Sequence, residues 1–213
     1  MVSLQSCDWD YERVAGFQPV LRTGVATVLA EIRRGTYLVD REGVDSRSVH
    51  HHMFHRLTPP AHPYYAGHYR GENFPCLFDY QVMIPADPLV GTHYATVDAA
   101  VALFGQDLLA AAAALDASFA LPDARLSQES KLYFAVVVAA RAFQEFLTIH
   151  PYANGNGHMA RFLVWLLLGR YGYWPRSWTI DPQPNVAGYS GAIFQHRRHQ
   201  PRPLEQLILE ALV

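Results

Sequence analysis

The spacing of apolar residues predicts a protein built mainly of α-helices. In six segments, apolar side chains recur every three to four residues, as they do on the buried face of a helix. The expected helices cover residues 19–34, 98–119, 132–147, 159–169, 186–196 and 204–212. The third and fourth are apolar on almost every side, so we expect both at the centre of one domain.

Residues 35–97 show a different pattern, without a long helical period. Apolar residues between turn signals predict a strand over 76–84, a turn over 85–88 and a hairpin partner over 90–94. A histidine cluster precedes them and contains His50, His51, His52 and His55. His51 and His55 have the i, i+4 spacing of metal ligands, but no carboxylate lies nearby, so we expect a surface loop.

Composition and charge narrow the class of protein. Half of the residues are apolar, enough for a sizeable core, and the net charge of −2 gives no indication of a nucleic-acid or membrane partner. The most apolar stretch, 162–168, is far short of the ~20 residues of a membrane span. Cys7 and Cys76 form no recognisable metal or disulfide framework, which favours a reducing compartment. We therefore expect a cytoplasmic protein, or a secreted effector without a cleavable signal peptide.

The segment 150–161, His-Pro-Tyr-Ala-Asn-Gly-Asn-Gly-His-Met-Ala-Arg, joins the two most apolar helices and holds the clearest candidate chemistry. Gly155 and Gly157 permit positive φ just before a helix, whose free N–H groups and dipole attract an anion. Asn156 fixes the turn or donates to that anion. His150, at the end of the preceding helix, is a candidate base. A base beside an anion-binding loop suits attack of a hydroxyl on a phosphoryl group.

A structural role is the alternative for each of these residues. The loop could be an ordinary glycine-rich turn, and His150 could cap helix carbonyls. His158 and Arg161 are three residues apart and can face the same side of their helix, although His158 could instead be solvent-exposed. Asn154 could bond its own backbone rather than a ligand. Tyr152 is expected to be a packing anchor.

The same segment resembles the signature of the Fic (Fido superfamily) proteins, His-Pro-Phe-x-(Asp/Glu)-Gly-Asn-Gly-Arg-x-x-Arg. The histidine, the proline, an aromatic residue, Gly-Asn-Gly and the final arginine are in register. Residues 67–70 and the following strand also resemble the segment before the family's target-binding hairpin, or flap. The resemblance implies a mainly α fold, with a Fic-like helical core and a small β-hairpin flap. It implies a catalytic core over 64–213 after an N-terminal extension with one helix over 1–63.

Members of this family mostly transfer AMP from ATP to a Ser, Thr or Tyr hydroxyl of a target protein, using Mg²⁺. By resemblance, His150 is the general base, and Arg161 holds the terminal phosphate. The implied nucleotide-binding and phosphate-binding residues are Gly155, Asn156, Gly157, His158 and Arg161. The implied flap residues Val82, Met83 and Ile84 would align the target segment by strand addition. The resemblance thus predicts a protein adenylyltransferase with ATP, Mg²⁺ and a target protein as its partners.

Two positions depart from the signature. Asn154 stands where the family has an acidic metal ligand, and its amide oxygen would bind Mg²⁺ without that charge. His158 stands where the family has its first arginine, and histidine has an unperturbed pKa of ~6.5. One alternative is therefore a catalytically degenerate domain that acts as a nucleotide-binding or regulatory module. Another is a relative that uses a different donor for phosphate or phosphocholine transfer. A hydrolase built on the histidine cluster is the weakest alternative.

Regulation is suggested by the first helix. Residues 27–31, Thr-Val-Leu-Ala-Glu, partly resemble the family's autoinhibitory pattern (Ser/Thr)-x-x-x-Glu-(Gly/Asn), whose glutamate pairs with the last arginine of the signature. Ile32 follows Glu31, so the match is incomplete, and an ordinary amphipathic helix is the alternative. The resemblance implies inhibition by Glu31, or by a separate inhibitory partner.

Overall fold

The computed structural model describes residue 7 and residues 9–212, and the described chain is mainly helical. The α-helices are α1 (Phe17–Arg33), α2 (Arg47–Phe54), α3 (Val97–Phe119), α4 (Gln128–Ile149), α5 (Asn156–Arg170), α6 (Tyr189–His196) and α7 (Arg202–Glu210). Shorter helical turns are η1 (Tyr11–Arg13), η2 (Val39–Gly43), η3 (Pro63–Tyr65) and η4 (Tyr94–Thr96). The six helices expected from apolar spacing are all present, which confirms the mainly α fold.

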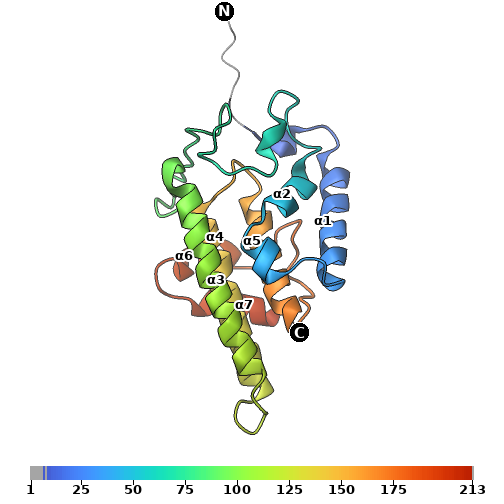
Figure 1. The fold of residues 1–213 in the computed structure, drawn as a ribbon, viewed down its shortest axis with the longest axis vertical. Helices are drawn as coiled ribbons and strands as arrows, with labels where there is room; N and C mark the ends of the chain where they lie inside the picture. Colours follow the sequence, from blue (N-terminus) through green and yellow to red (C-terminus); the bar gives the residue numbers. More distant parts are fainter. Residues whose placement is uncertain (1–6, 8, 213) are drawn as a thin grey trace, which may run out of the picture.

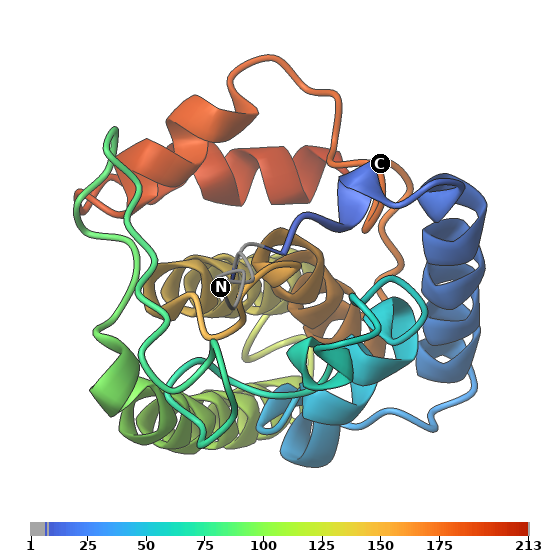
Figure 2. The same cartoon turned by 90° about the horizontal axis from the view of Figure 1, so that it is seen from above.

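The two most apolar helices lie at the centre of the molecule, as predicted. α5 packs along α4, α3 covers another side of α4, and α1 packs against both α5 and α2 (Figures 1 and 2). α6 and α7 pack together, and α7 contacts α4. Every residue of α5 from His158 to Leu168 is buried. The N-terminus of α5 is therefore fixed from several directions, which positions the loop before it.

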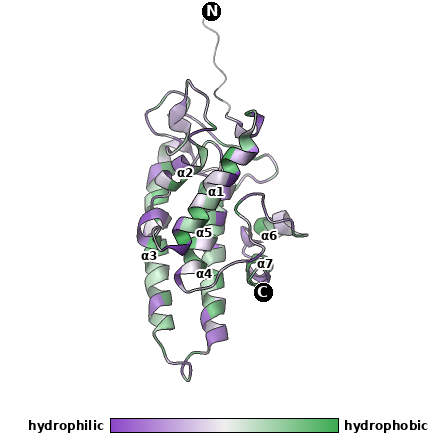
Figure 3. Ribbon diagram, turned by 90° about the vertical axis from the view of Figure 1, so that its right-hand side faces the viewer, coloured by the Kyte–Doolittle hydropathy of each residue, from purple (hydrophilic) through white to green (hydrophobic). Residues whose placement is uncertain are grey.

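α3 and α4 form a long hairpin whose far end extends beyond the other helices (Figures 1 and 3). The segments Tyr94–Phe119 and Gln128–Ile149 are long and apolar enough to meet a length-and-composition test for a membrane span. In the tested windows, 33% of the first segment and 50% of the second are buried inside the protein, and a helix of a protein core can pass the same test. The two segments are therefore weak evidence for a membrane.

The predicted strand over 76–84 and its hairpin are wrong, because the described chain there forms turns and irregular loop. Side chains bind the carbonyls that a strand partner would have bound. The Gln81 amide donates to the carbonyls of Val82 and Gly91 at 2.9 and 3.2 Å. The Arg70 guanidinium donates to the carbonyls of Tyr80 and Thr92, both at 3.0 Å. The two sides of the loop are thus joined by side chains rather than by a β-ladder.

The predicted surface loop at the histidine cluster is also wrong, because α2 occupies it and His50 is fully buried. The buried face of α2 consists of Val49, His50, Met53 and Phe54. His50 on that face interrupts the apolar pattern, so the spacing of apolar residues did not indicate a helix here. The expected extension over 1–63 accordingly holds two helices, α1 and α2, rather than one.

The two cysteines form a disulfide, contrary to the sequence-based expectation. Cys7 and Cys76 are separated by 69 positions in the chain, yet their Cα atoms lie 5.2 Å apart. The hydroxyl of Tyr65 also donates to the carbonyl of Cys7 at 2.8 Å, which fixes the N-terminal segment here. The spacing of two distant cysteines carries no signal of such a pairing. The expectation of a reducing compartment therefore loses its basis, because disulfides persist mainly in oxidising ones.

Candidate active site

The motif loop, residues 150–157, connects the C-terminus of α4 to the N-terminus of α5. His150 caps α4 with a left-handed φ of 54°, and Gly155 caps α5 with a φ of 81°. After this turn, the N–H groups of Asn156 and Gly157 have no hydrogen-bond partner in the part of the chain that the structure describes. Free N–H groups at the positive end of a 15-residue helix form an anion-binding position.

The inner side of the motif loop is held by the side chain of Asn156, which is only 2% exposed. Its Nδ2 donates to the carbonyl of Tyr152 at 2.8 Å, and its Oδ1 accepts from the N–H of the same residue at 2.9 Å. Asn156 therefore fixes the turn with its side chain and leaves only its backbone N–H for an anion. Tyr152 is fully buried, as expected for a packing anchor.

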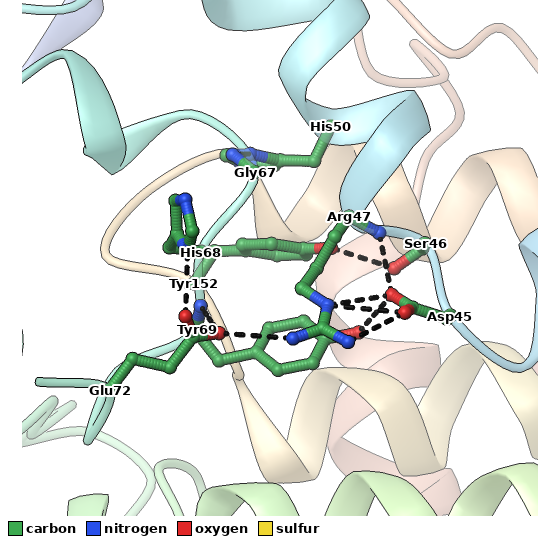
Figure 4. Close-up of polar contacts among 9 residues, drawn as sticks. All are labelled: Asp45, Ser46, Arg47, His50, Gly67, His68, Tyr69, Glu72 and Tyr152. Carbon is green, nitrogen blue, oxygen red and sulfur yellow. Dashed lines mark hydrogen bonds and ion pairs between the residues drawn. The ribbon is translucent and has the colours of Figure 1, made fainter.

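His50 on α2 supports the inner side of the motif loop (Figure 4). Its ring stacks on Tyr152, with centroids 3.7 Å apart and an interplanar angle of 2°. Its Nδ1 accepts from the N–H of Gly67 at 3.0 Å, so Nε2 carries the proton and donates to the carbonyl of Asn154 at 3.0 Å. Burial lowers the pKa of His50 to about 3, so the ring is neutral at physiological pH. His50 belongs to no recognisable motif, so this role was not predicted.

A chain of polar contacts continues from Tyr152 towards the surface (Figure 4). The hydroxyls of Tyr152 and Ser46 lie 2.9 Å apart, and the hydroxyl of Tyr69 donates to Asp45 at 3.3 Å. Arg47 pairs with Asp45 at 2.7 Å and lies over the ring of Tyr69. These contacts join the start of α2 to the motif loop and rigidify its inner side.

A hydrogen bond to α4 holds the ring of His150 in one tautomer. Its Nδ1–H donates to the carbonyl of Leu147 at 3.2 Å, which leaves the lone pair on Nε2. Burial lowers the pKa of His150 to about 4, against a smaller opposing effect of the Leu147 carbonyl. The side chain lines two cavities at once, a large one along the motif loop and a smaller one beside α6. His150 is thus unprotonated and stands where two ligands could meet.

Arg70 fixes the end of α4 that carries His150. Its Nε donates to the carbonyl of His150 at 2.8 Å, and its Nη2 donates to that of Ile149 at 3.1 Å. A cation on the last carbonyls of a helix stabilises the helix end. Burial lowers the pKa of Arg70 to about 10, so the side chain remains charged at pH 7. Since Arg70 also binds Tyr80 and Thr92, it connects this helix end to the loop at 80–92.

Arg161 is 5% exposed and lines both cavities. Its Nε donates to the carbonyl of Ile180 at 2.7 Å, and no carboxylate of the described chain forms an ion pair with it. His158, on the same side of α5, places Nε2 3.1 Å from Asp181 Oδ1. Burial lowers the pKa of His158, and the bond to Asp181 opposes this shift. His158 is therefore buried and bound to a carboxylate, not solvent-exposed.

Both amide atoms of the Asn154 side chain form hydrogen bonds within the protein. Its Oδ1 accepts from the N–H of Gly155 at 2.7 Å, and its Nδ2 donates to the carbonyl of Trp9 at 2.9 Å. The next residue must be glycine, because a Cβ on Gly155 would lie 2.7 Å from the ring of Phe54 and 3.0 Å from Nε2 of His50. Both residues therefore shape the loop.

The large cavity has a volume of about 1350 Å³ and runs along the outer side of the motif loop. One wall is the N-terminal strap, residues 9–14, which follows the disulfide-bonded Cys7. Trp9 anchors the strap, since its Nε1 donates to the carbonyl of Leu57 at 3.0 Å and its ring stacks on Tyr65. Asp181 also lines this cavity. Neither the strap nor Asp181 belongs to a recognisable motif, so neither could be predicted from the sequence.

The structure brings some predicted residues to the site and leaves others away from it. Gly155, Asn156, Gly157, His158 and Arg161 line the large cavity together with His150 and Asn154. Ile84 lines the smaller cavity of about 380 Å³, which shares His150, Gly157 and Arg161 with the large one. Met83 is 82% exposed, and Val82 lies where the loop meets Gly91. The carboxylate of Glu31 pairs with Arg34 at 2.5 Å and does not reach Arg161.

These features describe a helical domain in which an unprotonated histidine and a helix N-terminus with free N–H groups line the same cavity. The model of the Fic/DOC family matches residues 44–168, more than half of the chain, and this protein belongs to that family. The matched residues include α2, the loop at 80–92 and the whole motif loop. No curated protein matches the chain.

Proposed function

We propose that this protein is an adenylyltransferase that moves AMP from ATP to a Ser, Thr or Tyr hydroxyl of a target protein. Membership of the Fic/DOC family supports a transferase of this general class. The observation that carries the proposal is the position of His150, which lines both cavities and whose Nδ1–H bond to Leu147 leaves a lone pair on Nε2. The nucleotide would occupy the large cavity, and the target segment would enter through the smaller one.

The transfer is a displacement at the α-phosphorus of ATP. The target hydroxyl oxygen forms the new P–O bond while the bond to the pyrophosphate oxygen breaks. Nε2 of His150 accepts the hydroxyl proton, and pyrophosphate leaves with the electron pair of the broken bond. The N–H groups of Asn156 and Gly157 and the guanidinium of Arg161 would bind phosphate oxygens. Nearby phosphates would raise the pKa of His150 and make it a stronger base.

The loop at 80–92 would hold the target segment. Asp87 on this loop forms ion pairs with Arg197 and Arg198 at the end of α6, so the loop and α6 together enclose the smaller cavity. Its apolar lining includes Ile84, Ile193 and Phe194. Exposed main-chain groups near Val82 and Met83 would pair with an extended target segment.

Labelled ATP tests the proposal directly. The protein is incubated with cell extracts and with ATP labelled at either the α- or the γ-phosphate. We expect protein labelling from the α-label only, reduced about 10²–10⁴-fold in His150→Asn. Asparagine suits the left-handed φ of 54° at this position, so the variant should fold. Labelling from the γ-phosphate only would show that the protein transfers phosphate rather than AMP. Undiminished labelling by His150→Asn would show that His150 is not the general base.

A second candidate function is nucleotide binding without transfer. The bond between His158 and Asp181 favours it, because this side chain then offers no permanent positive charge to a phosphate. ATP binding in calorimetry, combined with no labelling from any nucleotide, would support a binding module. Labelling from a phosphocholine donor in place of ATP would support the third expectation, transfer of another phosphate-linked group.

A further inference from the structure

Three carboxylates line the large cavity, and they differ in their contacts and exposure. Asp10 pairs with Arg13 at 2.9 Å, and Glu12 is exposed on the strap. Asp181, which also lines the cavity, is partly buried, with 22% of its side chain exposed. One of its oxygens lies 3.1 Å from His158 on the first turn of α5. Asp181 is therefore the carboxylate held next to the anion-binding helix N-terminus.

Asp181 also lies in the electrostatic field of Arg161. The bond from His158 and the charge of Arg161 both lower the pKa of Asp181, so this carboxylate is ionised at neutral pH. A donor phosphate that binds Arg161 would thus approach a negative charge already present at the site. The single charge of Arg161 does not balance both Asp181 and a donor polyphosphate, so a further cation beside them would reduce their repulsion.

Asn154, at the signature position for a metal ligand, is poorly suited to bind that cation. It carries no charge, and its Oδ1 already accepts from the N–H of Gly155. Moving the side chain would also break the bond from its Nδ2 to Trp9. Asp181 has an ionised oxygen, Oδ2, that forms no hydrogen bond or ion pair within the described chain. Mg²⁺ commonly binds one or two carboxylates together with substrate phosphates, so a single well-placed Asp suffices.

We propose that Asp181, and not Asn154, supplies the carboxylate ligand for the Mg²⁺ that accompanies the donor nucleotide. The inference rests on the proposed function for the identity of the donor. Asp181 would hold the cation beside the donor phosphates through Oδ2, and Oδ1 would keep its bond to His158. His158 stands where the family signature has an arginine, and in this proposal it positions the carboxylate that binds the metal.

Nucleotide binding measured with and without Mg²⁺ tests this assignment. Calorimetry with α,β-methylene-ATP, which cannot transfer AMP, gives a Kd with Mg²⁺ and a Kd with EDTA. We expect the wild type to bind at least about tenfold more tightly with Mg²⁺, and Asp181→Asn to lose that advantage. Without Mg²⁺, Asp181→Asn should bind as tightly as the wild type or more tightly, because one repelling charge is gone.

Asp40→Asn is the matched control, because it makes the same chemical change at an exposed residue that lines neither cavity. It should keep the Mg²⁺ advantage within about twofold, since it removes a carboxylate charge away from the nucleotide. Asp181→Asn retains an amide oxygen that can accept from His158, and nucleotide binding in EDTA shows that it is folded. An unchanged Mg²⁺ advantage in Asp181→Asn, or none in the wild type, would overturn the assignment. Target labelling is scored separately, so Mg²⁺-dependent binding without labelling rejects the transfer reaction alone.

Discussion

The two sides of the motif loop differ in how their polar groups are used. On the inner side, both amide atoms of Asn156 bind Tyr152, and His50 binds the carbonyl of Asn154. On the outer side, the N–H groups of Asn156 and Gly157 face the cavity without partners in the described chain. The inner side therefore stabilises a backbone shape, and the outer side presents that shape to a ligand.

This difference separates residues that support the loop from residues that we propose to act on the ligand. Asn156 belongs to both groups, because its side chain faces inward and its N–H faces the cavity. Substitution of an inner-side residue should destabilise the protein and thereby reduce its activity. Substitution of an outer-side residue should reduce activity without a change in stability. Four predictions test this separation, beginning with the largest effect on stability.

Gly155→Ala should destabilise the protein by about 3 kcal/mol or more. A side chain at φ 81° is strained, and its Cβ would also overlap Phe54 and His50 on the inner side. Gly172→Ala is the control, because Gly172 has the same φ of 81° but no atom within 4 Å of the added Cβ. It should cost only about 1 kcal/mol. Urea unfolding measures both, and equal losses would show that the inner contacts do not matter.

Asn156→Ala should destabilise the protein by about 2–3 kcal/mol in the same measurement. It leaves the buried N–H and carbonyl of Tyr152 without partners. The exposed Asn185→Ala serves as the control and should change stability by less than about 0.5 kcal/mol. A loss of activity in Asn156→Ala without a loss of stability would place this side chain on the functional side instead.

The sequence predicted the outer side of the loop better than the inner side. The helices were visible because α3, α4 and α5 are long and strongly apolar, and the glycines and His150 follow a recognisable signature. The supporting residues were not visible, because they come from distant segments. His50 looked like part of a surface cluster, and Asp181 is an isolated carboxylate after α5.

The failed predictions of the strand and of the unpaired cysteines share one physical cause. The pattern at 76–84 predicted a strand, but the side chains of Arg70 and Gln81 bind carbonyls of that loop. The pairing of Cys7 with Cys76 likewise depends on the fold, which brings the strap to the loop. Long-range contacts made by single side chains leave no periodic pattern in a sequence, whereas buried helices do.

The stability of the protein should fall in acid because of two buried histidines. The folded pKa values of His50 and His150 are about 3 and about 4, below the ordinary value of 6.5. Below pH 6.5 the unfolded chain binds protons that the folded protein does not. The free energy of unfolding should therefore decrease towards pH 4 by up to about 1.4 kcal/mol per pH unit for each histidine.

The variant His50→Gln separates the contribution of the inner side from that of the outer side. Glutamine can donate to the carbonyl of Asn154 but does not titrate, so the slope below pH 6.5 should decrease by the contribution of one histidine. Above pH 7 the stability of the wild type and of the variant should be independent of these groups. An unchanged slope in His50→Gln would mean that His50 is protonated in the folded protein.

His150→Asn should have the smallest effect on stability, within about 0.5 kcal/mol at pH 7, although it removes the proposed base. Asparagine tolerates the left-handed backbone of this position, and the carbonyl of residue 150 keeps its bond from Arg70. The variant also removes a buried titratable group, so its stability should fall less in acid than that of the wild type. A large loss at neutral pH would show that His150 supports the loop as His50 does, and the distinction between the two sides would fail.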